Sequence, residues 1–474
     1  MSVDLLLKNA LVVTEDATFK GGVAVANGQI TRVFTGDQEI AAQKIVDLCG
    51  KVLLPGLVDG HVHFNEPGRT AWEGYRTGTK AAAAGGITTI VDMPLNATPP
   101  TINLNKLEHK RAVVADQAVV DYAHWGGLVD NNLAELAAMH KAGVVGFKGF
   151  MSESGVDFAR IDDEMLYAAL QEAAQLDTLI AVHAENNAVT TQLGAQMQAA
   201  GRTERRAWTL SRPPATEVEA IGRALFWAEQ AGSALHVVHV STAAGVQAIV
   251  EARRRGVNVT AESCPHYLFF TDEDLVQLGP IAKCAPPLRC AAEVDALWKM
   301  VLAGHVDIIG SDHSPCTTDL KVRGNQNIWD AWGGISGIQS MLPAMLTAGV
   351  RNRGLSLSAL AKIMCANPAR RYGLYPQKGA LLPGSDADFV VVDPEAKWTL
   401  TTEQLFYKNK HSPYVGETFY GQVQATYVRG ALVYRQHEIL AHPGFGKLLK
   451  RTPANGVIAS SIKTAATNRI PKQA

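Results

Sequence analysis

Apolar runs of strand length alternate with segments of helical spacing through the middle of the chain. Segments such as 162–175, 217–230 and 243–254 place apolar residues three to four positions apart, as an amphipathic helix does. Strands joined by helical crossovers are typical of a parallel α/β sheet. Eight runs favour a (β/α)8 barrel, with an open doubly wound sheet as the alternative. The runs are 57–62, 88–93, 119–122, 144–150, 179–183, 235–239, 257–261 and 307–310.

The two ends of the chain have a different pattern. Residues 4–14 and 21–33 are rich in β-formers, and Asn27-Gly28 interrupts the second stretch with a hairpin signal. Short stretches of the same kind return at 379–393 and 425–434. The pattern predicts an α/β protein with a small β-sandwich domain built from both termini. We assign 1–55 and 375–445 to that domain, 56–374 to the barrel, and the aperiodic 446–474 to a C-terminal extension.

Composition narrows the classes of protein that fit this pattern. The chain has 474 residues, 47% of them hydrophobic, which allows a sizeable core. A formal net charge of −1 argues against a nucleic-acid partner or an anionic membrane surface. No run approaches the roughly 20 apolar residues of a spanning helix, and no signal-peptide pattern is evident. The six cysteines form no CxxC pair, which favours free thiols in a reducing compartment. We therefore expect a cytoplasmic protein.

Candidate metal ligands stand at the ends of several predicted strands. His61 and His63 are two positions apart, so on a strand both imidazoles project to the same side and could share one ion. His183 and His239 end the fifth and sixth runs, and Asp312 follows the eighth. Active sites of (β/α)8 barrels are built at the C-terminal ends of the strands. These side chains are therefore expected to converge on one metal site.

Lys148 lies inside the apolar run 144–150, where a charged amine would be costly. One interpretation is a structural lysine that is ion-paired or extends to solvent. The other is a neutral amine that reacts with CO2 and becomes an anionic carbamate able to bridge two metal ions. His236, three positions before His239, points to the other side of its strand and is predicted to be structural.

The segments that contain these residues resemble the cyclic-amide branch of the metal-dependent amidohydrolase superfamily, which includes dihydroorotases, hydantoinases and allantoinases. The resemblance extends from the N-terminal strands to about residue 445. The matching segments are HVHFNEPGRTAWEGY (61–75), VDMPLN (91–96), VVGFKGFM (144–151), HAEN (183–186), ESCPHY (262–267), KCAPPLR (283–289), GSDHSPC (310–316), AWGGISG (331–337) and HSPYVG (411–416).

This resemblance implies a binuclear centre with Lys148 as N6-carboxylysine, which requires CO2. The metals would be Zn²⁺, with Co²⁺, Fe²⁺ or Mn²⁺ as alternatives. A hydroxide bridging the ions would attack the ring carbonyl, with Asp312 as general base and then general acid. A homotetramer is also implied. One ion would be bound by His61, His63, Lys148 and Asp312, and the other by Lys148, His183 and His239.

Differences within the branch bear on the cyclic amide. Asn65 stands two residues after His63, where dihydroorotases have an arginine that binds the substrate carboxylate; Arg69 lies close by and could partly compensate. Hydantoinases usually have a tyrosine shortly after the carboxylated lysine, whereas Lys148 is followed by GFMSES. Both differences resemble allantoinases and imply hydrolysis of allantoin to allantoate in purine degradation. Hydantoinase or dihydropyrimidinase activity is the alternative, and dihydroorotase activity is less favoured.

Allantoin is a hydantoin ring with a neutral ureido arm, so it needs hydrogen-bond partners rather than an ion clamp. Asn96, Cys284, Ser314 and Trp332 are candidate substrate contacts, through side chain or backbone, although ordinary loop structure would also explain each of them. Scaffold relatives of the same fold have no catalytic activity and lack several metal ligands. Because all six ligand candidates are present here, the sequence favours an enzyme over such a scaffold.

Overall fold

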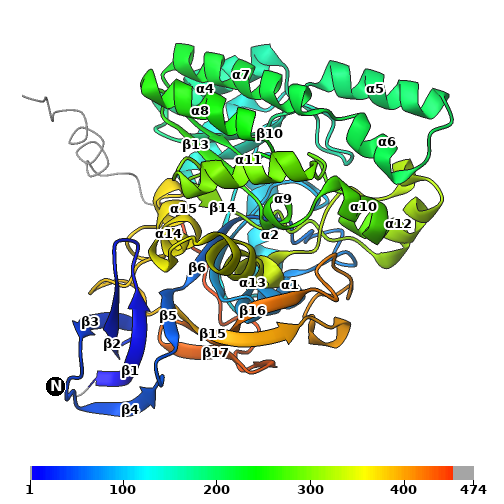
Figure 1. Cartoon of the computed structure of the whole chain (residues 1–474). Helices are drawn as coiled ribbons and strands as arrows, with labels where there is room; N and C mark the ends of the chain where they lie inside the picture. The colour runs from blue at the N-terminus through cyan, green and yellow to red at the C-terminus, as the bar shows by residue number, and fades with distance from the viewer. Residues whose placement is uncertain (1–2, 452–474) are drawn as a thin grey trace, which may run out of the picture.

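Parallel strands from the middle of the chain form a closed barrel in the computed structural model, which describes residues 3–451 (Figure 1). Its wall consists of the sheets β6-β7-β8 and β9 to β14, each in sequence order. Only Trp125 separates β8 from β9, and a parallel bridge between Val62 and His313 joins β6 to the chain after β14. The barrel is therefore confirmed over the open sheet. Its strands are β6 (Leu57–Val62), β7 (Ile87–Asp92), β8 (Asp121–His124), β9 (Gly126–Gly127), β10 (Phe147–Phe150), β11 (Leu179–His183), β12 (Ala234–Val237), β13 (Val259–Ser263) and β14 (Ile308–Ile309).

Helices cover the outside of this barrel and begin and end at recognisable signals. The Asp162 side chain accepts a hydrogen bond from the Met165 amide (3.0 Å) and caps α4. Pro214 opens α7, and Gly232 ends it with a φ of 63°. The three predicted helical segments are all present. The larger helices are α1 (Tyr75–Ala84), α2 (Leu104–Val114), α4 (Asp163–Gln175), α5 (Asn187–Ala199), α7 (Pro214–Ala231), α8 (Ala243–Arg254) and α11 (Ala291–Leu302).

Shorter helices lie in the loops and after the last strand of the barrel. They are α3 (Leu136–Lys141), α6 (Arg205–Leu210), α9 (Pro265–Phe269), α10 (Asp272–Leu278), α12 (Thr318–Val322), α13 (Met341–Met345), α14 (Leu357–Ala361) and α15 (Asn367–Arg371). Among the described residues, no helix combines the length and apolar character needed to cross a membrane.

Strands from both chain ends assemble on one side of the barrel into a nine-stranded mixed sheet (Figure 1). One edge of β1 pairs with β2, and its other edge pairs with β4 and then with β5. The predicted hairpin turn is present between β2 and β3, because Asn27 and Gly28 have φ values of 54° and 75°. The strands are β1 (Val3–Val13), β2 (Thr18–Ala26), β3 (Gln29–Thr35), β4 (Ala42–Asp47), β5 (Val52–Pro55), β15 (Phe389–Thr399), β16 (Thr418–Val428), β17 (Ala431–Arg435) and β18 (Glu438–Ile439).

The strand predicted from residue 379 begins only at Phe389. Gly379 and Gly384 have φ values of 71° and 90°, which turn the chain before it can extend. The C-terminal extension is ordered in its described part. There the Tyr122 amide donates to the Lys447 carbonyl (3.0 Å), and the Leu449 amide donates to the Tyr122 carbonyl (2.7 Å). The rest of the predicted extension, 452–474, lies outside the described residues.

A buried ionic cluster connects the barrel to the sheet. Lys378 is 1% exposed, and its amine lies 2.5 Å from a carboxylate oxygen of Asp121 on β8. The same amine lies 2.8 Å from Asp386 and 2.9 Å from Asp388, just before β15. Arg429, at the turn between β16 and β17, also pairs with Asp121. Since unpaired charges are costly inside a protein, this cluster fixes how the two parts meet.

Large aromatic side chains fill the interior of the barrel beneath the predicted site. Trp125 donates its indole N–H to the Gly60 carbonyl (2.9 Å), and its ring meets Tyr372 at 5.5 Å between centroids. A side chain at position 60 would overlap the Tyr372 ring, so only glycine fits beside His61. The strand that contains His61 is therefore packed closely against Trp125 and Tyr372.

Candidate metal centre

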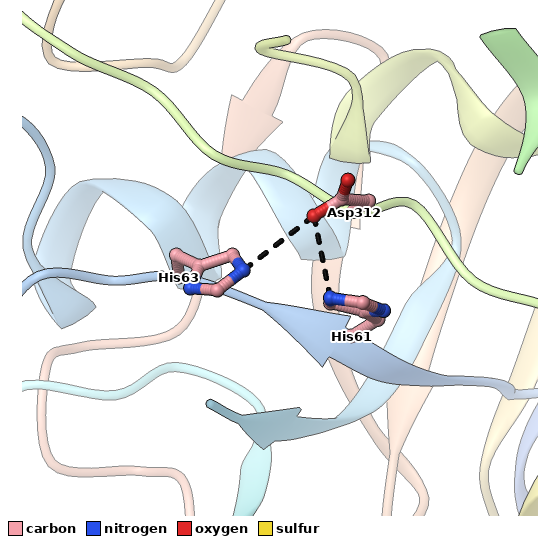
Figure 2. Close-up of side chains that lie close together, drawn as sticks. All are labelled: His61, His63 and Asp312. Carbon is pink, nitrogen blue, oxygen red and sulfur yellow. Dashed lines mark ion pairs between the residues drawn. The ribbon is translucent and has the colours of Figure 1, made fainter. Parts of the chain in front are cut away.

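His61, His63 and Asp312 form a compact buried cluster at the mouth of the barrel. Figure 2 shows Asp312 reaching from the segment after β14 toward both imidazoles. Asp312 Oδ1 lies 3.3 Å from His61 Nε2 and 3.5 Å from His63 Nε2. Ligand atoms held tetrahedrally at 2.0–2.1 Å from one ion are about 3.3–3.5 Å apart. The three groups thus have the spacing and the chemistry of metal ligands.

A second pair of histidines lies beside this cluster. His183 Nδ1 and His239 Nε2 are 2.9 Å apart, with the rings at 4.6 Å between centroids. The His239 ring is also 5.3 Å from the His61 ring, so the pair adjoins the first cluster. The convergence of these strand ends, predicted from their positions in the sequence, is present in the structure.

Lys148 on β10 is fully buried, and its amine has no hydrogen-bond partner within the described chain. The amine lies 4.6 Å from the centroid of the Phe150 ring, which stacks on His183 at the same distance. Burial lowers the pKa of Lys148 to about 8, so deprotonation is far easier than for an exposed lysine. A fully buried amine without a partner does not fit the interpretation of a lysine that is ion-paired or extends to solvent.

The backbone turns sharply at several of these residues. His239 and Asp312 follow the ends of their strands with φ values of 41° and 44°, in the left-handed region that disfavours side chains. Asn65 and Asn96 have φ values of 53° and 69°. Such conformations cost free energy and cluster at functional sites, where the surrounding fold enforces them. The sequence pattern did not predict the left-handed backbone conformation of His239 and Asp312.

Glu262 on β13 is a contributor that sequence interpretation missed. Its two carboxylate oxygens lie 2.7 Å from His61 Nδ1 and 3.2 Å from His236 Nε2. A carboxylate on Nδ1 places the proton there and leaves the Nε2 lone pair of His61 facing Asp312. Burial would raise the pKa of Glu262, but His61 and His236 hold it well below its usual range. Glu262 lies in the segment ESCPHY, which resembles the family, but the resemblance gave no role to Glu262.

Glu185 orients His183 in the same way. Its carboxylate lies 2.8 Å from His183 Nε2, so the Nδ1 atom faces His239. Arg212, between α6 and α7, lies 2.5 Å from the same carboxylate. Burial opposes ionisation, but Arg212 and His183 bring the pKa of Glu185 to about 2. Each histidine pair therefore has a buried anion behind one of its rings.

The protonation states suit a divalent cation. Burial lowers the pKa values of His63, His183 and His239, which leaves their lone pairs available at neutral pH. Burial would raise the pKa of Asp312, but His61 and His63 hold it at about 2, so this carboxylate is anionic. Neutral imidazoles with an anionic oxygen are the donors that Zn²⁺ and similar ions take.

Three of the four candidate substrate contacts are joined through Ser314, two residues after Asp312. Asn96 Nδ2 lies 3.4 Å from Ser314 Oγ, and Trp332 Nε1 donates to the Ser314 carbonyl (3.1 Å). The fourth, Cys284, is 2% exposed, and its carbonyl already accepts the Trp208 indole N–H (2.8 Å). The structure thus brings Asn96, Ser314 and Trp332 into direct contact.

Asn65 has an unexpected environment. Its side chain is 1% exposed, and neither amide atom has a hydrogen-bond partner in the described part of the chain. A buried, unpaired amide two residues after His63 is a free donor and acceptor at the site. Arg69, the other candidate for the role of that arginine, has partners of its own. Its guanidinium donates to the Asn96 carbonyl (2.9 Å) and lies over Trp72.

The fold and the cluster together define a (β/α)8-barrel protein with a metal-binding type of active site. A model of the amidohydrolase family matches residues 52–433. The allantoinase of Rubrobacter xylanophilus is 47% identical over 439 residues, covering 91% of this chain and 96% of its own. The allantoinase of Deinococcus radiodurans is 44% identical and covers 95% and 99%.

Solved structures agree with this assignment. L-hydantoinase (dihydropyrimidinase) from Arthrobacter aurescens matches with a TM-score of 0.92 at 37% identity, covering 95% of this chain and 100% of that one. The chain belongs to the amidohydrolase family, whose members are metal-dependent hydrolases.

Replacing Glu262 by Gln should weaken metal binding, because it removes the charge that orients His61. Losses of about 10–100-fold in affinity are typical for such a partner of a ligating histidine. Competition with a chelator, followed by metal analysis, measures the effect. Glu164→Gln, at an exposed position of α4, is the matched control. Equal affinity in the Glu262→Gln variant and the parent would contradict the role of Glu262.

Proposed function

We propose that the protein is an allantoinase, which hydrolyses the cyclic amide of allantoin to allantoate. The observation that carries this proposal is similarity to several allantoinases at 40–47% identity over nearly the whole chain. The alternative is a hydantoinase or dihydropyrimidinase, and the match to L-hydantoinase at 37% identity favours it over other classes. Asn65 in place of an arginine supports a neutral substrate over dihydroorotate.

The ligand set that we propose comprises two sites that share Lys148. The 3.3 and 3.5 Å spacings around Asp312 support one site. The adjacency of the His183 and His239 rings to each other and to His61 supports the other. We propose Zn²⁺, with Co²⁺, Fe²⁺ or Mn²⁺ as alternatives, because imidazole and carboxylate donors accept all of them. The first site would consist of His61, His63, Lys148 and Asp312, and the second of Lys148, His183 and His239.

Carboxylation of Lys148 by CO2 would resolve an electrostatic conflict. A protonated amine in this position would repel bound cations, and no carboxylate pairs with it among residues 3–451. A bond from Nζ to the carbon of CO2, with loss of one proton, converts the amine to an anionic carbamate with two oxygen donors. The fully buried position and the lowered pKa support this reaction, which needs the neutral amine.

The chain's own residues then divide the work of hydrolysis. When bound, the metal ions would supply a lowered pKa for water and polarisation of the substrate carbonyl. Asp312, anionic at neutral pH, would accept the proton of the attacking water at Oδ1 or Oδ2. As the new C–O bond forms and the ring C–N bond breaks, Asp312 would pass this proton to the leaving nitrogen. Glu262 and Glu185 would keep the imidazole rings oriented throughout.

Substrate contacts are proposed at the rim of the same site. Asn96, Ser314, Trp332 and the backbone near Cys284 remain candidates, and Asn65 joins them because its buried amide is unpaired. These groups are neutral, which suits a ring with a ureido arm. We also propose a homotetramer, as the family resemblance implies, and a cytoplasmic location, which the six unpaired cysteines support.

A substrate panel tests the proposed function. Purified, metal-loaded protein should hydrolyse allantoin with a higher kcat/KM than hydantoin, dihydrouracil or dihydroorotate. The similarity to allantoinases supports the preference over the two neutral rings, and the neutral rim supports the preference over dihydroorotate. Chelator-treated protein serves as the control and should be inactive. A clear preference for hydantoin or dihydrouracil would favour the alternative, and a preference for dihydroorotate would overturn the interpretation of Asn65.

Replacing Asp312 by Asn should lower kcat by about 10²–10⁴-fold, the usual contribution of a general acid–base residue. The amide cannot accept the proton of the attacking water. Steady-state rates on allantoin measure the loss, and metal content is determined in parallel. Asp319→Asn, at an exposed position of α12, is the control. Substantial activity in Asp312→Asn protein that binds metal normally would contradict the proposed role.

Carboxylation of Lys148 should make reconstitution pH-dependent. With a pKa of about 8, the neutral amine is about one-tenth of the population at pH 7 and about nine-tenths at pH 9. At fixed dissolved CO2, the rate at which metal-free protein regains activity should therefore rise about tenfold over this range. Lys148→Met protein should regain none. A rate that is constant or falls as pH rises would count against carboxylation.

A further inference from the structure

Two buried lysines outside the proposed reaction lie beneath the loop that carries Trp332. Lys283 is 3% exposed and Lys321, on α12, is 5% exposed. Neither forms an ion pair with a carboxylate anywhere in residues 3–451. Burying an ammonium group without a counter-ion is costly, so its hydrogen bonds must stabilise something specific.

Lys321 binds backbone carbonyls only. Its Nζ donates to Trp332 (2.9 Å), Gly334 (2.5 Å) and Lys283 (3.3 Å), which uses all three N–H groups. Lys283 Nζ donates to Ile328 (2.8 Å) and Ala331 (2.7 Å). The two ammonium groups thus tie the segment 328–334 to the segment that contains Cys284. Burial lowers the pKa of Lys321 to about 8, which agrees with a dry environment.

The loop that Lys321 holds is one part of a closed ring of contacts at the barrel mouth. Trp332 Nε1 donates to the Ser314 carbonyl (3.1 Å), and the Asn96 amide reaches Ser314 Oγ (3.4 Å). Arg69 donates to the Asn96 carbonyl (2.9 Å), and its guanidinium lies 5.3 Å from the Trp72 ring. Trp72 meets Trp332 at 4.7 Å between centroids, which closes the ring.

This ring has a polar inner part and an aromatic outer part. Asn96 and Ser314, which follows Asp312 by two residues, are buried, whereas Trp72 and Trp332 are partly exposed. Gly334 packs directly against the Ser314 carbonyl, where a side chain would overlap it. The position of the segment 328–334 therefore determines where the Trp332 indole lies relative to Ser314. For a substrate ring bound at the proposed contacts Asn96 and Ser314, a substituent that extends toward Trp332 would meet this aromatic part.

We propose that Lys321 is a positioning residue that sets the place of Trp332 and thereby the fit of the ureido arm of allantoin. This inference rests on the proposed function, and it concerns discrimination between allantoin and unsubstituted hydantoin. Lys321 itself does not touch the substrate. Its three hydrogen bonds to backbone carbonyls hold the loop that carries Trp332 in one position. Without these hydrogen bonds, Trp332 would no longer be held against Trp72.

Lys321→Met keeps the length of the side chain and removes its donors. The KM for allantoin should rise at least tenfold with kcat within threefold of the parent, and metal content should be unchanged. Binding of hydantoin, measured as substrate or competitive inhibitor, should change less than threefold. Lys299→Met, at an exposed position of α11, is the matched control. An unchanged KM for allantoin, an equal effect on both compounds, or loss of metal would overturn the proposal.

A double-mutant cycle tests whether Lys321 acts through Trp332. The variants Trp332→Phe, Lys321→Met and their combination should show non-additive effects on KM, because both changes affect the same contact. Additive effects would overturn the proposal. If Lys321→Met yields no folded protein, Lys321→Gln, which retains a shorter donor, replaces it in both assays. Parent turnover of allantoin tests the proposed function separately, whereas the ratio of variant to parent tests Lys321.

Discussion

Removal of ionisable groups from water is the constraint on which this site depends. Six titratable residues meet at the barrel mouth, and as whole residues none is more than 7% exposed. Burial lowers the pKa values of His63, His183 and His239, and a buried amine without a partner loses its proton readily. A metal ion is the natural counterpart of such a donor set, because it binds neutral nitrogen and anionic oxygen together. The six residues are His61, His63, Lys148, His183, His239 and Asp312.

Buried carboxylates and the barrel floor make this arrangement rigid. Glu262 contacts His61 and receives support from His236 and from the Tyr372 hydroxyl at 3.3 Å. Glu185 contacts His183 and is paired with Arg212. These partners come from β12, β13 and the loop after β11, together with the segments between α6 and α7 and after α15. His239 and Asp312 keep their left-handed backbone conformation at the strand ends because the residues packed around them enforce it.

The proposed substrate contacts lie in the loops and not in the strands of the barrel. The backbone matches that of a hydantoinase with a TM-score of 0.92, yet the sequence is more similar to allantoinases. A shared scaffold that positions the metal centre can therefore serve several cyclic amides. The substrate contacts that we propose are loop residues such as Asn65, with its unpaired amide, and the ring of contacts around Trp332. Loops on a rigid scaffold commonly determine specificity in this way.

The sequence alone determined the barrel, the ligand types and the strand ends at which they stand. The periodicity of apolar residues and the spacing of His61 and His63 are local signals. The structure agrees with them because the need to bury apolar residues determines the conformation of each strand separately. Only the tertiary structure revealed Glu262, which lies 201 positions from His61, the pairing of Lys447 and Leu449 with β8, and the contacts of Lys321. These features depend on contacts between distant segments. No local pattern encodes such contacts, since it is the closing of the barrel that brings the segments together.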